Sequence, residues 1–137
     1  MVDREQDLAV AELLAPERRT RWREFLAKGT RPARNKALSI LHHGPVIDER
    51  FAARVPAAQA PHGAAWVLGE LRRRGAPDLC YVISTDGELD GRSMPLVAAL
   101  ECVYGVTMGA IISCIPGRLA YYEGEDRGER YILDRQP

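Results

Sequence analysis

Apolar runs of strand length alternate with one helical run and short polar turns in the last third of the chain, residues 79–137. The runs 79–84 and 110–115 are almost continuously apolar, which is typical of strands buried on both faces of a sheet. Between them, Ser93 can cap a helix over residues 94–104, which Gly105 ends. This order predicts a βαβ unit with two parallel strands and a right-handed crossover.

Two further strands are predicted after this unit, over residues 118–123 and 129–134. The polar segment between them has the composition of a hairpin turn, so these strands should form an antiparallel meander beside the parallel pair. Neighbouring residues of a strand face opposite sides, which places one of Tyr121 and Tyr122 in the core and the other at the surface. The expected sheet is therefore mixed and four-stranded.

The first half of the chain is predicted to be helical. Apolar residues recur at helical spacing in four segments that are bounded by proline, glycine or a polar capping residue: 4–14, 16–28, 30–43 and 62–74. Thr30 is the expected N-cap of the third segment. Residues 48–53 have room for one helical turn, and the alanine- and proline-bearing stretch 55–61 resembles an internal linker.

These elements predict an α+β fold in which N-terminal helices pack against the mixed four-stranded sheet. We expect a single domain over residues 1–137, helical in 1–75 and βαβββ in 79–134, because 137 residues suffice for one core without disulfides. The three cysteines form no CxxC pair and lie in apolar runs, so we expect Cys80, Cys102 and Cys114 in the core.

Location and assembly follow from the same pattern. No apolar run is long enough to span a bilayer, and the first residues lack the basic and apolar segments of a signal peptide. We therefore expect a cytoplasmic protein with no membrane partner. The strand at 129–134 would leave an open sheet edge, which could pair with a second copy to form a homodimer.

Charge is unevenly distributed along a chain whose net charge is zero. Residues 16–43 contain eight basic and two acidic side chains, a net charge of +6, whereas residues 76–137 contain ten acidic and five basic ones, a net charge of −5. Such polarity can orient a charged partner, attract a polyanion to one end, or bring the two halves of the chain together.

Three carboxylates, Asp86, Glu88 and Asp90, alternate along residues 86–91. The pattern resembles the first half of a calcium-binding EF-hand loop, but the twelfth position is Val97, where that loop has a bidentate glutamate. A looser Mg²⁺ or Ca²⁺ site would allow a metal-assisted enzyme at this loop. The simpler interpretation is a solvated turn, with no metal and no cofactor.

The two helices on either side of Gly29 and Thr30 could form a helix-turn-helix, which would bind nucleic acid through the basic helices 16–43. Arginine and asparagine suit the edges of guanine and adenine, and arginine also binds phosphates. Any amphipathic helical hairpin turns polar residues outward, so the pattern is not specific. The candidate residues of this nucleic-acid site are Arg18, Arg19, Arg23, Arg31, Arg34 and Asn35.

The sequence contains no nucleotide-binding loop, nucleophile elbow or paired zinc-ligand motif, and no segment resembles a named family. We expect a noncatalytic module that binds a protein partner through the acidic surface of its C-terminal half. The negative charge of this surface implies a basic partner. The residues expected to bind are Asp86, Glu88, Asp90, Arg92, Glu123, Glu125 and Asp126.

Overall fold

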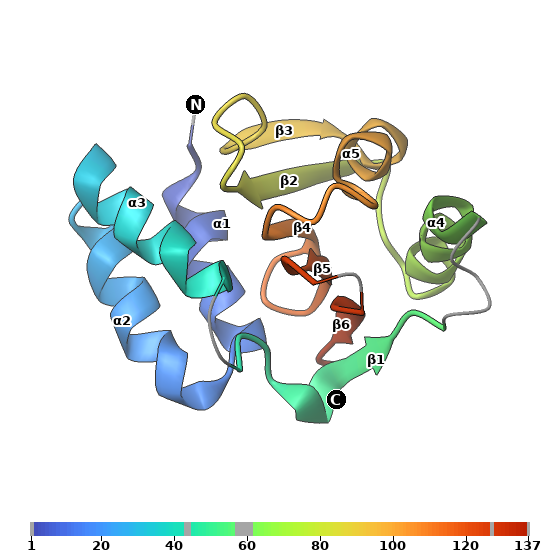
Figure 1. The fold of residues 1–137 in the computed structure, drawn as a ribbon, viewed down its shortest axis with the longest axis horizontal. Coiled ribbons are helices and arrows are strands. Elements are labelled where there is room, and N and C mark those ends of the chain that lie inside the picture. Colours follow the sequence, from blue (N-terminus) through green and yellow to red (C-terminus); the bar gives the residue numbers. More distant parts are fainter. Residues whose placement is uncertain (1, 43–44, 57–61, 127, 137) are drawn as a thin grey trace.

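Figure 1 shows a computed structural model of the protein, an α+β fold built on a six-stranded antiparallel sheet. The structure describes residues 2–42, 45–56, 62–126 and 128–136. Along the sheet, the strands follow the order β1-β6-β5-β4-β2-β3. Their bounds are β1 (Ala52–Arg54), β2 (Leu79–Ser84), β3 (Arg92–Pro95), β4 (Ala110–Ile115), β5 (Leu119–Glu123) and β6 (Arg130–Asp134).

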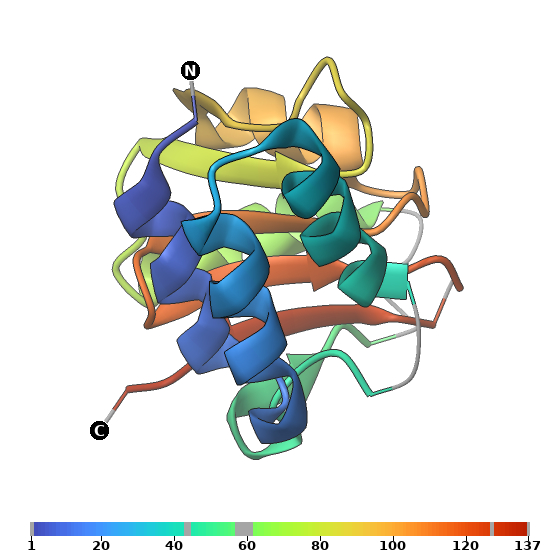
Figure 2. The ribbon, with the colours of Figure 1, turned by 90° about the vertical axis from the view of Figure 1, so that its left-hand side faces the viewer.

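Three N-terminal helices cover one face of the sheet, as Figure 2 shows: α1 (Arg4–Ala9), α2 (Pro16–Ala27) and α3 (Arg31–Ser39). Local signals set their ends, because Pro16 opens α2 and the Thr30 hydroxyl accepts a hydrogen bond from the amide of Ala33 at 3.2 Å. Two 3-10 turns, η1 (Val10–Leu13) and η2 (Ile40–His42), follow α1 and α3. The predicted helices 4–14 and 30–43 are therefore each a helix that continues as a tighter turn.

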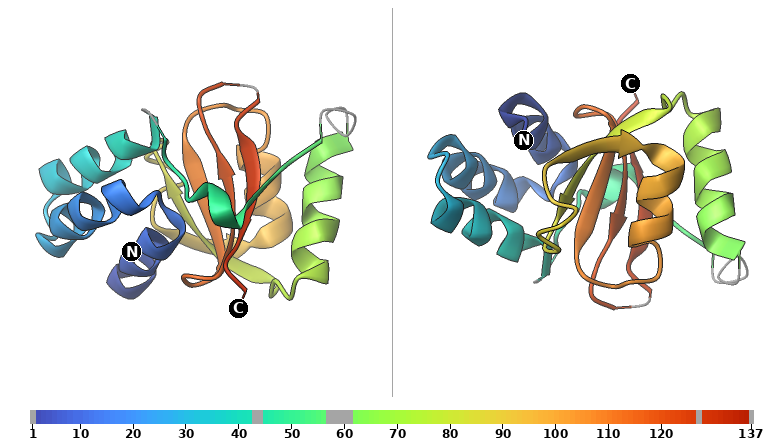
Figure 3. Two further views of the ribbon diagram at one scale, coloured as in Figure 1. Left: turned by 90° about the horizontal axis from the view of Figure 1, so that it is seen from below. Right: turned by 90° about the horizontal axis from the view of Figure 1, so that it is seen from above.

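Two further helices, α4 (Gly63–Arg73) and α5 (Leu96–Val103), cover the opposite face, so that Figure 3 shows the sheet between two helical layers. Each face of the sheet has its own core. Tyr122 packs in the core shared with α1, α2 and α3, and Tyr121 packs in the core shared with α4 and α5. The prediction that one of these tyrosines lies at the surface is wrong, because helices cover both faces. None of the described helices has both the length and the apolar character needed to cross a membrane.

The predicted parallel pairing of the two central strands is also wrong. β2 and β4 are direct neighbours and antiparallel. The chain first reverses through β3, in which Ser93 pairs with Tyr81 instead of capping a helix, and α5 begins only after Pro95. β3 and β4 both run antiparallel to β2, so α5 is a crossover between two strands of the same direction that lie on either side of β2. β3 was missed because Met94 is its single buried residue.

The sheet has six strands rather than four because β1 pairs with β6, with Ala53 opposite Ile132. The edge that was predicted to be open at residues 129–134 is therefore covered, and β1 and β3 are the edge strands. The predicted single turn at 48–53 is the 3-10 turn η3 (Glu49–Phe51), which leads directly into β1. Residues 57–61 of the predicted linker lie outside the described residues.

Candidate functional site

The predicted acidic segments meet at one end of the sheet. The strand register places Ser84 opposite Ala110 and Ala110 opposite Glu123, so β4 begins where β2 and β5 end. The loop 85–91, the loop 104–109 and the turn residues 124–126 therefore lie at the same end. We call these three segments the acidic end, because they carry the carboxylates of Asp86, Glu88, Asp90, Glu125 and Asp126.

Glu123 is buried beneath the acidic end, with 1% of its surface exposed. Its Oε1 accepts hydrogen bonds from the amide of Gly105 at 2.9 Å and from the hydroxyl of Tyr121 at 2.8 Å, and its Oε2 accepts one from the amide of Thr107 at 2.7 Å. Burial, and then the charge of Glu123, raise the pKa of Tyr121 above its ordinary value, so Tyr121 remains a donor. Glu123 thus anchors the loop 104–109 and is not available to a partner.

Asp90 is also engaged inside the fold, with a side chain that is 3% exposed. Its two oxygens accept hydrogen bonds from the guanidinium of Arg34 at 2.7 and 2.9 Å, and the Ser84 amide donates to one of them at 3.1 Å. The same guanidinium donates to both oxygens of Asp7, at 2.7 and 3.3 Å. Tyr81 completes this network with a hydrogen bond of 2.7 Å from its hydroxyl to Asp7.

Arg34 therefore joins α3 to α1 and to the loop 85–91. Burial by itself lowers the pKa of Arg34, but the hydrogen bonds and charges of Asp90 and Asp7 outweigh that effect and raise the pKa above its ordinary value. The guanidinium consequently remains charged in the interior. Arg34 was expected to face a nucleic acid and Asp90 a protein partner, whereas the structure places both in one buried ion network.

The loop 104–109 presents two large apolar side chains to solvent, Val106 with 46% and Met108 with 42% of its surface exposed. Thr107 between them has a φ of 58°, a left-handed conformation that residues with a side chain rarely adopt. Glu123 holds this residue from one side, and the Thr85 hydroxyl donates to the carbonyl oxygen of Met108 from the other. The surrounding contacts therefore hold both apolar side chains at the surface.

Sequence reasoning overlooked Val106 and Met108, although a signal was present. Both stand in a short segment between Gly105 and Gly109, outside any strand or helix pattern. Large apolar residues in such a glycine-bounded loop have little chance of reaching the core, which makes them candidates for contact with a partner.

Val106 and Met108 line a small depression together with Asp86, Leu89 and Cys102. Its volume of about 10 Å³ is close to the space that one water needs. The surface is therefore too closely filled to hold a small-molecule substrate, and it offers instead an apolar patch with carboxylates beside it.

Several predicted binding residues do not line this depression, among them Glu88, Arg92, Glu125 and Asp126. Glu88 and Asp126 are exposed, and neither forms an ion pair with another described residue. Asp86 is half-buried, and its Oδ1 accepts a hydrogen bond from the amide of Glu88 at 2.9 Å, which stabilises the turn. Glu125 contacts Nδ1 of His42. Arg92 is exposed at the start of β3.

The loop 86–90 does not assemble a set of metal ligands. Asp90 directs both of its oxygens to Arg34. Across the part of the chain that the structure describes, no three His, Cys, Asp or Glu side chains are grouped so that they could hold a metal ion. This arrangement of donors does not support a metal-assisted enzyme at the loop.

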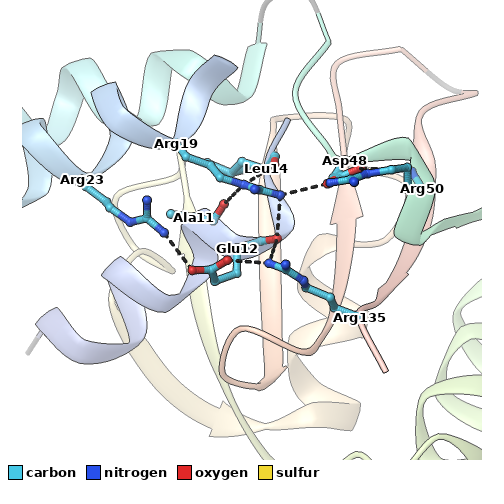
Figure 4. A network of polar contacts seen from close by, with 8 residues as sticks. All are labelled: Ala11, Glu12, Leu14, Arg19, Arg23, Asp48, Arg50 and Arg135. Carbon is cyan, nitrogen blue, oxygen red and sulfur yellow. Dashed lines mark hydrogen bonds and ion pairs between the residues drawn. The ribbon is translucent and has the colours of Figure 1, made fainter. Parts of the chain in front are cut away.

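Two of the predicted nucleic-acid residues hold helices together, as Figure 4 shows. Arg19 donates to three backbone carbonyl oxygens at 3.0, 3.1 and 3.2 Å, and its Nη2 lies 2.8 Å from the carboxylate of Asp48. Hydrogen bonds from Arg50 hold the pKa of Asp48 below its ordinary value. Arg23 pairs with Glu12 at 2.9 Å. Arg19 and Arg23 are therefore both in ion pairs within the protein, although Asp48 and Glu12 each also pair with a second arginine.

The remaining predicted residues lie at the surface of the helical layer. Arg18 lines a groove between α2 and α3 together with Arg21 and Lys36, and this groove has a volume of about 320 Å³. Arg31 is 66% exposed, with its guanidinium 3.9 Å from Asp90, and Asn35 is exposed on α3. Arg21 and Lys36 were not among the predicted site residues, although Arg21 lies three residues beyond Arg18 on one helical face.

Cys102 is exposed, unlike the buried Cys80 and Cys114, so the prediction that all three cysteines lie in the core is wrong at Cys102. Burial raises the pKa of Cys80 to about 11 and that of Cys114 to about 12. We expect one thiol per chain to react rapidly with Ellman's reagent near neutral pH and the other two to react only after unfolding. A Cys102→Ser variant should lose the rapid reaction, and two rapidly reacting thiols in the folded protein would contradict the expectation.

Two surfaces thus combine charged side chains with accessible apolar ones: the acidic end, and the groove between α2 and α3. The acidic end brings together the two acidic segments that the sequence singled out, 86–90 and 123–126, although Asp90 and Glu123 serve the fold. Compared with known proteins, the chain matches no family model, no curated protein and no solved structure.

Proposed function

We propose that the protein is a noncatalytic cytoplasmic module that binds a basic segment of a partner protein at the acidic end. The observation that carries the proposal is the loop 104–109, which holds Val106 and Met108 in solvent beside Asp86. The exposed carboxylates of Glu88, Glu125 and Asp126 lie at the same end of the sheet. Exposed apolar side chains favour burial against a partner, and the surrounding carboxylates favour a partner with lysine or arginine beside its own apolar residues.

The contacts that order the loop 104–109 support this proposal. Thr107 keeps an unfavourable left-handed conformation, and the buried carboxylate of Glu123 accepts hydrogen bonds from two amides of the same loop. A surface that is already ordered loses little conformational entropy when a partner binds. The contacts inside the protein therefore prepare the apolar patch for association.

The charges at the rim also decide what kind of occupant fits. Glu88 and Asp126 are exposed and have no ion pair among the described residues, so a basic segment would gain attraction without displacing an internal partner. Two acidic ends would repel each other, which favours a separate partner over a second copy of this chain.

Selection from a library of random peptides displayed on phage tests the proposal. We expect the selected peptides to combine lysine or arginine with leucine, isoleucine or aromatic residues. The variant Glu88→Lys/Asp126→Lys should weaken the binding of a selected peptide by about tenfold or more, and the variant Val106→Ser/Met108→Ser should do the same by removing the apolar contact. Fluorescence anisotropy of the labelled peptide measures both effects.

The matched control is Glu17→Lys/Glu24→Lys, which changes the net charge equally at two exposed glutamates of α2. This control should bind the peptide as the unchanged protein does. A bound peptide should also slow the reaction of Cys102 with Ellman's reagent, because Cys102 lines the same depression. Equal weakening by both pairs of lysine substitutions, or peptides without basic residues, would refute the proposal.

A further inference from the structure

The groove between α2 and α3 lies on the helical layer, and we infer that it binds the phosphate backbone of a single-stranded nucleic acid. Its walls carry Arg18 and Arg21 from α2 and Lys36 from α3. Within the described ranges, none of these three cations forms an ion pair. Three like charges around one groove repel one another, and a bound polyanion would relieve that repulsion.

The contrast with neighbouring arginines shows that these cations differ from the structural ones. Arg19 and Arg23 stand on the same helix but are paired with Asp48 and Glu12. The acidic residues of α2, Glu17 and Glu24, do not line the groove. The cations of the groove are therefore available to a ligand, whereas Arg19 and Arg23 are bound to carboxylates of the protein.

A second pocket continues the cationic surface. It has a volume of about 310 Å³, and Arg4 and Arg31 lie in its lining, with the charge of Asp7 in the same lining balanced by Arg34. Phe25 lines both this pocket and the groove. Two cationic pockets that share one residue fit a ligand with several phosphates along a chain better than a ligand with a single phosphate.

Phe25 adds a surface for a base. Its ring is half-buried, and the guanidinium carbon of Arg21 lies 5.6 Å from the ring centroid. Aromatic rings and arginine planes stack with bases of any sequence, which is typical of proteins that bind single strands without sequence preference. The predicted helix-turn-helix would instead read a duplex with the outer face of α3, but Arg34 of that helix is buried in the ion network. The geometry therefore favours a single strand over a duplex.

Fluorescence anisotropy of a labelled oligothymidylate of about 12 nucleotides, titrated with the full chain at several salt concentrations, tests this inference. If Arg18, Arg21, Lys36, Arg4 and Arg31 each replace one counterion, the logarithm of the association constant should fall against the logarithm of salt concentration with a slope of about −3.5. The variant Arg18→Gln/Arg21→Gln/Lys36→Gln should reduce the slope to about −1.4 and weaken binding about tenfold or more in dilute salt.

The control variant Arg54→Gln/Arg72→Gln/Arg73→Gln removes the same charge at three exposed arginines outside both pockets. It should bind the oligonucleotide within about twofold of the unchanged protein, and circular dichroism verifies that both variants are folded. Absence of binding in dilute salt, or equal weakening by both variants, would overturn the inference. Tighter binding of a duplex of the same length, or equal binding of thymidine monophosphate, would overturn the assignment to a single strand. None of these outcomes depends on peptide binding at the acidic end.

Discussion

Replacement of Arg34 by methionine is expected to lower the free energy of unfolding by about 3–5 kcal/mol. The substitution leaves the buried carboxylates of Asp7 and Asp90 without their shared cation, at positions where the side chains are 4% and 3% exposed. An ion that is buried without a partner is costly because it has lost both its water and its counter-charge. A loss of this size is a large fraction of the stability of an ordinary domain, which is about 5–15 kcal/mol.

Urea denaturation measures this loss, and Arg23→Gln is its matched control. Arg23 also pairs with a carboxylate, but both side chains of that pair are more than 40% exposed, so its removal should cost about 1 kcal/mol or less. If the Arg34→Met protein does not fold, Tyr81→Phe provides a milder change. It removes the 2.7 Å hydrogen bond to Asp7 and should cost about 1–2 kcal/mol. If Tyr81→Phe and Arg34→Met are both as stable as Arg23→Gln, the buried ion network does not contribute to the stability of the fold.

Replacement of Glu123 by alanine is expected to lower the free energy of unfolding by about 3 kcal/mol and to abolish peptide binding at the acidic end. The amides of Gly105 and Thr107 and the hydroxyl of Tyr121 all lose their acceptor, and Arg130 loses its buried counter-charge. Without these hydrogen bonds, the unfavourable left-handed conformation of Thr107 is no longer stabilised by its surroundings. The apolar side chains of the loop would then no longer be held in place.

Hydrogen exchange and peptide binding together test the role of Glu123. The amides of Gly105 and Thr107 should exchange faster in Glu123→Ala than in the unchanged protein, while the amides of the central strand β4 should remain protected. Glu101→Ala, at an exposed glutamate of α5, is the control and should alter neither stability nor exchange by more than a small amount. Unchanged peptide binding by a folded Glu123→Ala protein would mean that the hydrogen bonds from the loop 104–109 to Glu123 are not needed for the proposed function.

Local sequence patterns were sufficient to predict a strand or a helix end where adjacent residues specify it. β2 and β4 have the predicted bounds 79–84 and 110–115, because continuous apolar runs of that length suit strands buried on both faces. The start of α2 at Pro16 and the cap of α3 at Thr30 are also as predicted, since capping depends on a few adjacent residues. The α+β class followed from these elements.

Short edge strands and strand pairing depend on contacts that no local pattern contains. β1 and β3 have three and four residues, and neither shows the apolar alternation from which strands are recognised. β3 reverses the chain, and α5 then connects it to a strand of the same direction, so β4 runs antiparallel to β2. The predicted order of strand, helix and strand did not contain this reversal. The number of strands and their directions were therefore decided by tertiary pairing.

The candidate sites show the same division between what adjacent residues specify and what distant contacts decide. The sequence by itself determined which charges this protein carries, the basic excess in 16–43 and the acidic excess in 76–137. Only the tertiary structure decided which of them remain available, because the environment of a charge depends on residues far away in the chain. Arg34 meets an acid 56 residues away and becomes part of the interior, while Lys36, two positions later on the same helix, remains at the surface without an ion pair among the described residues. A charge buried with a partner supports the fold, and a charge left in solvent can meet a ligand.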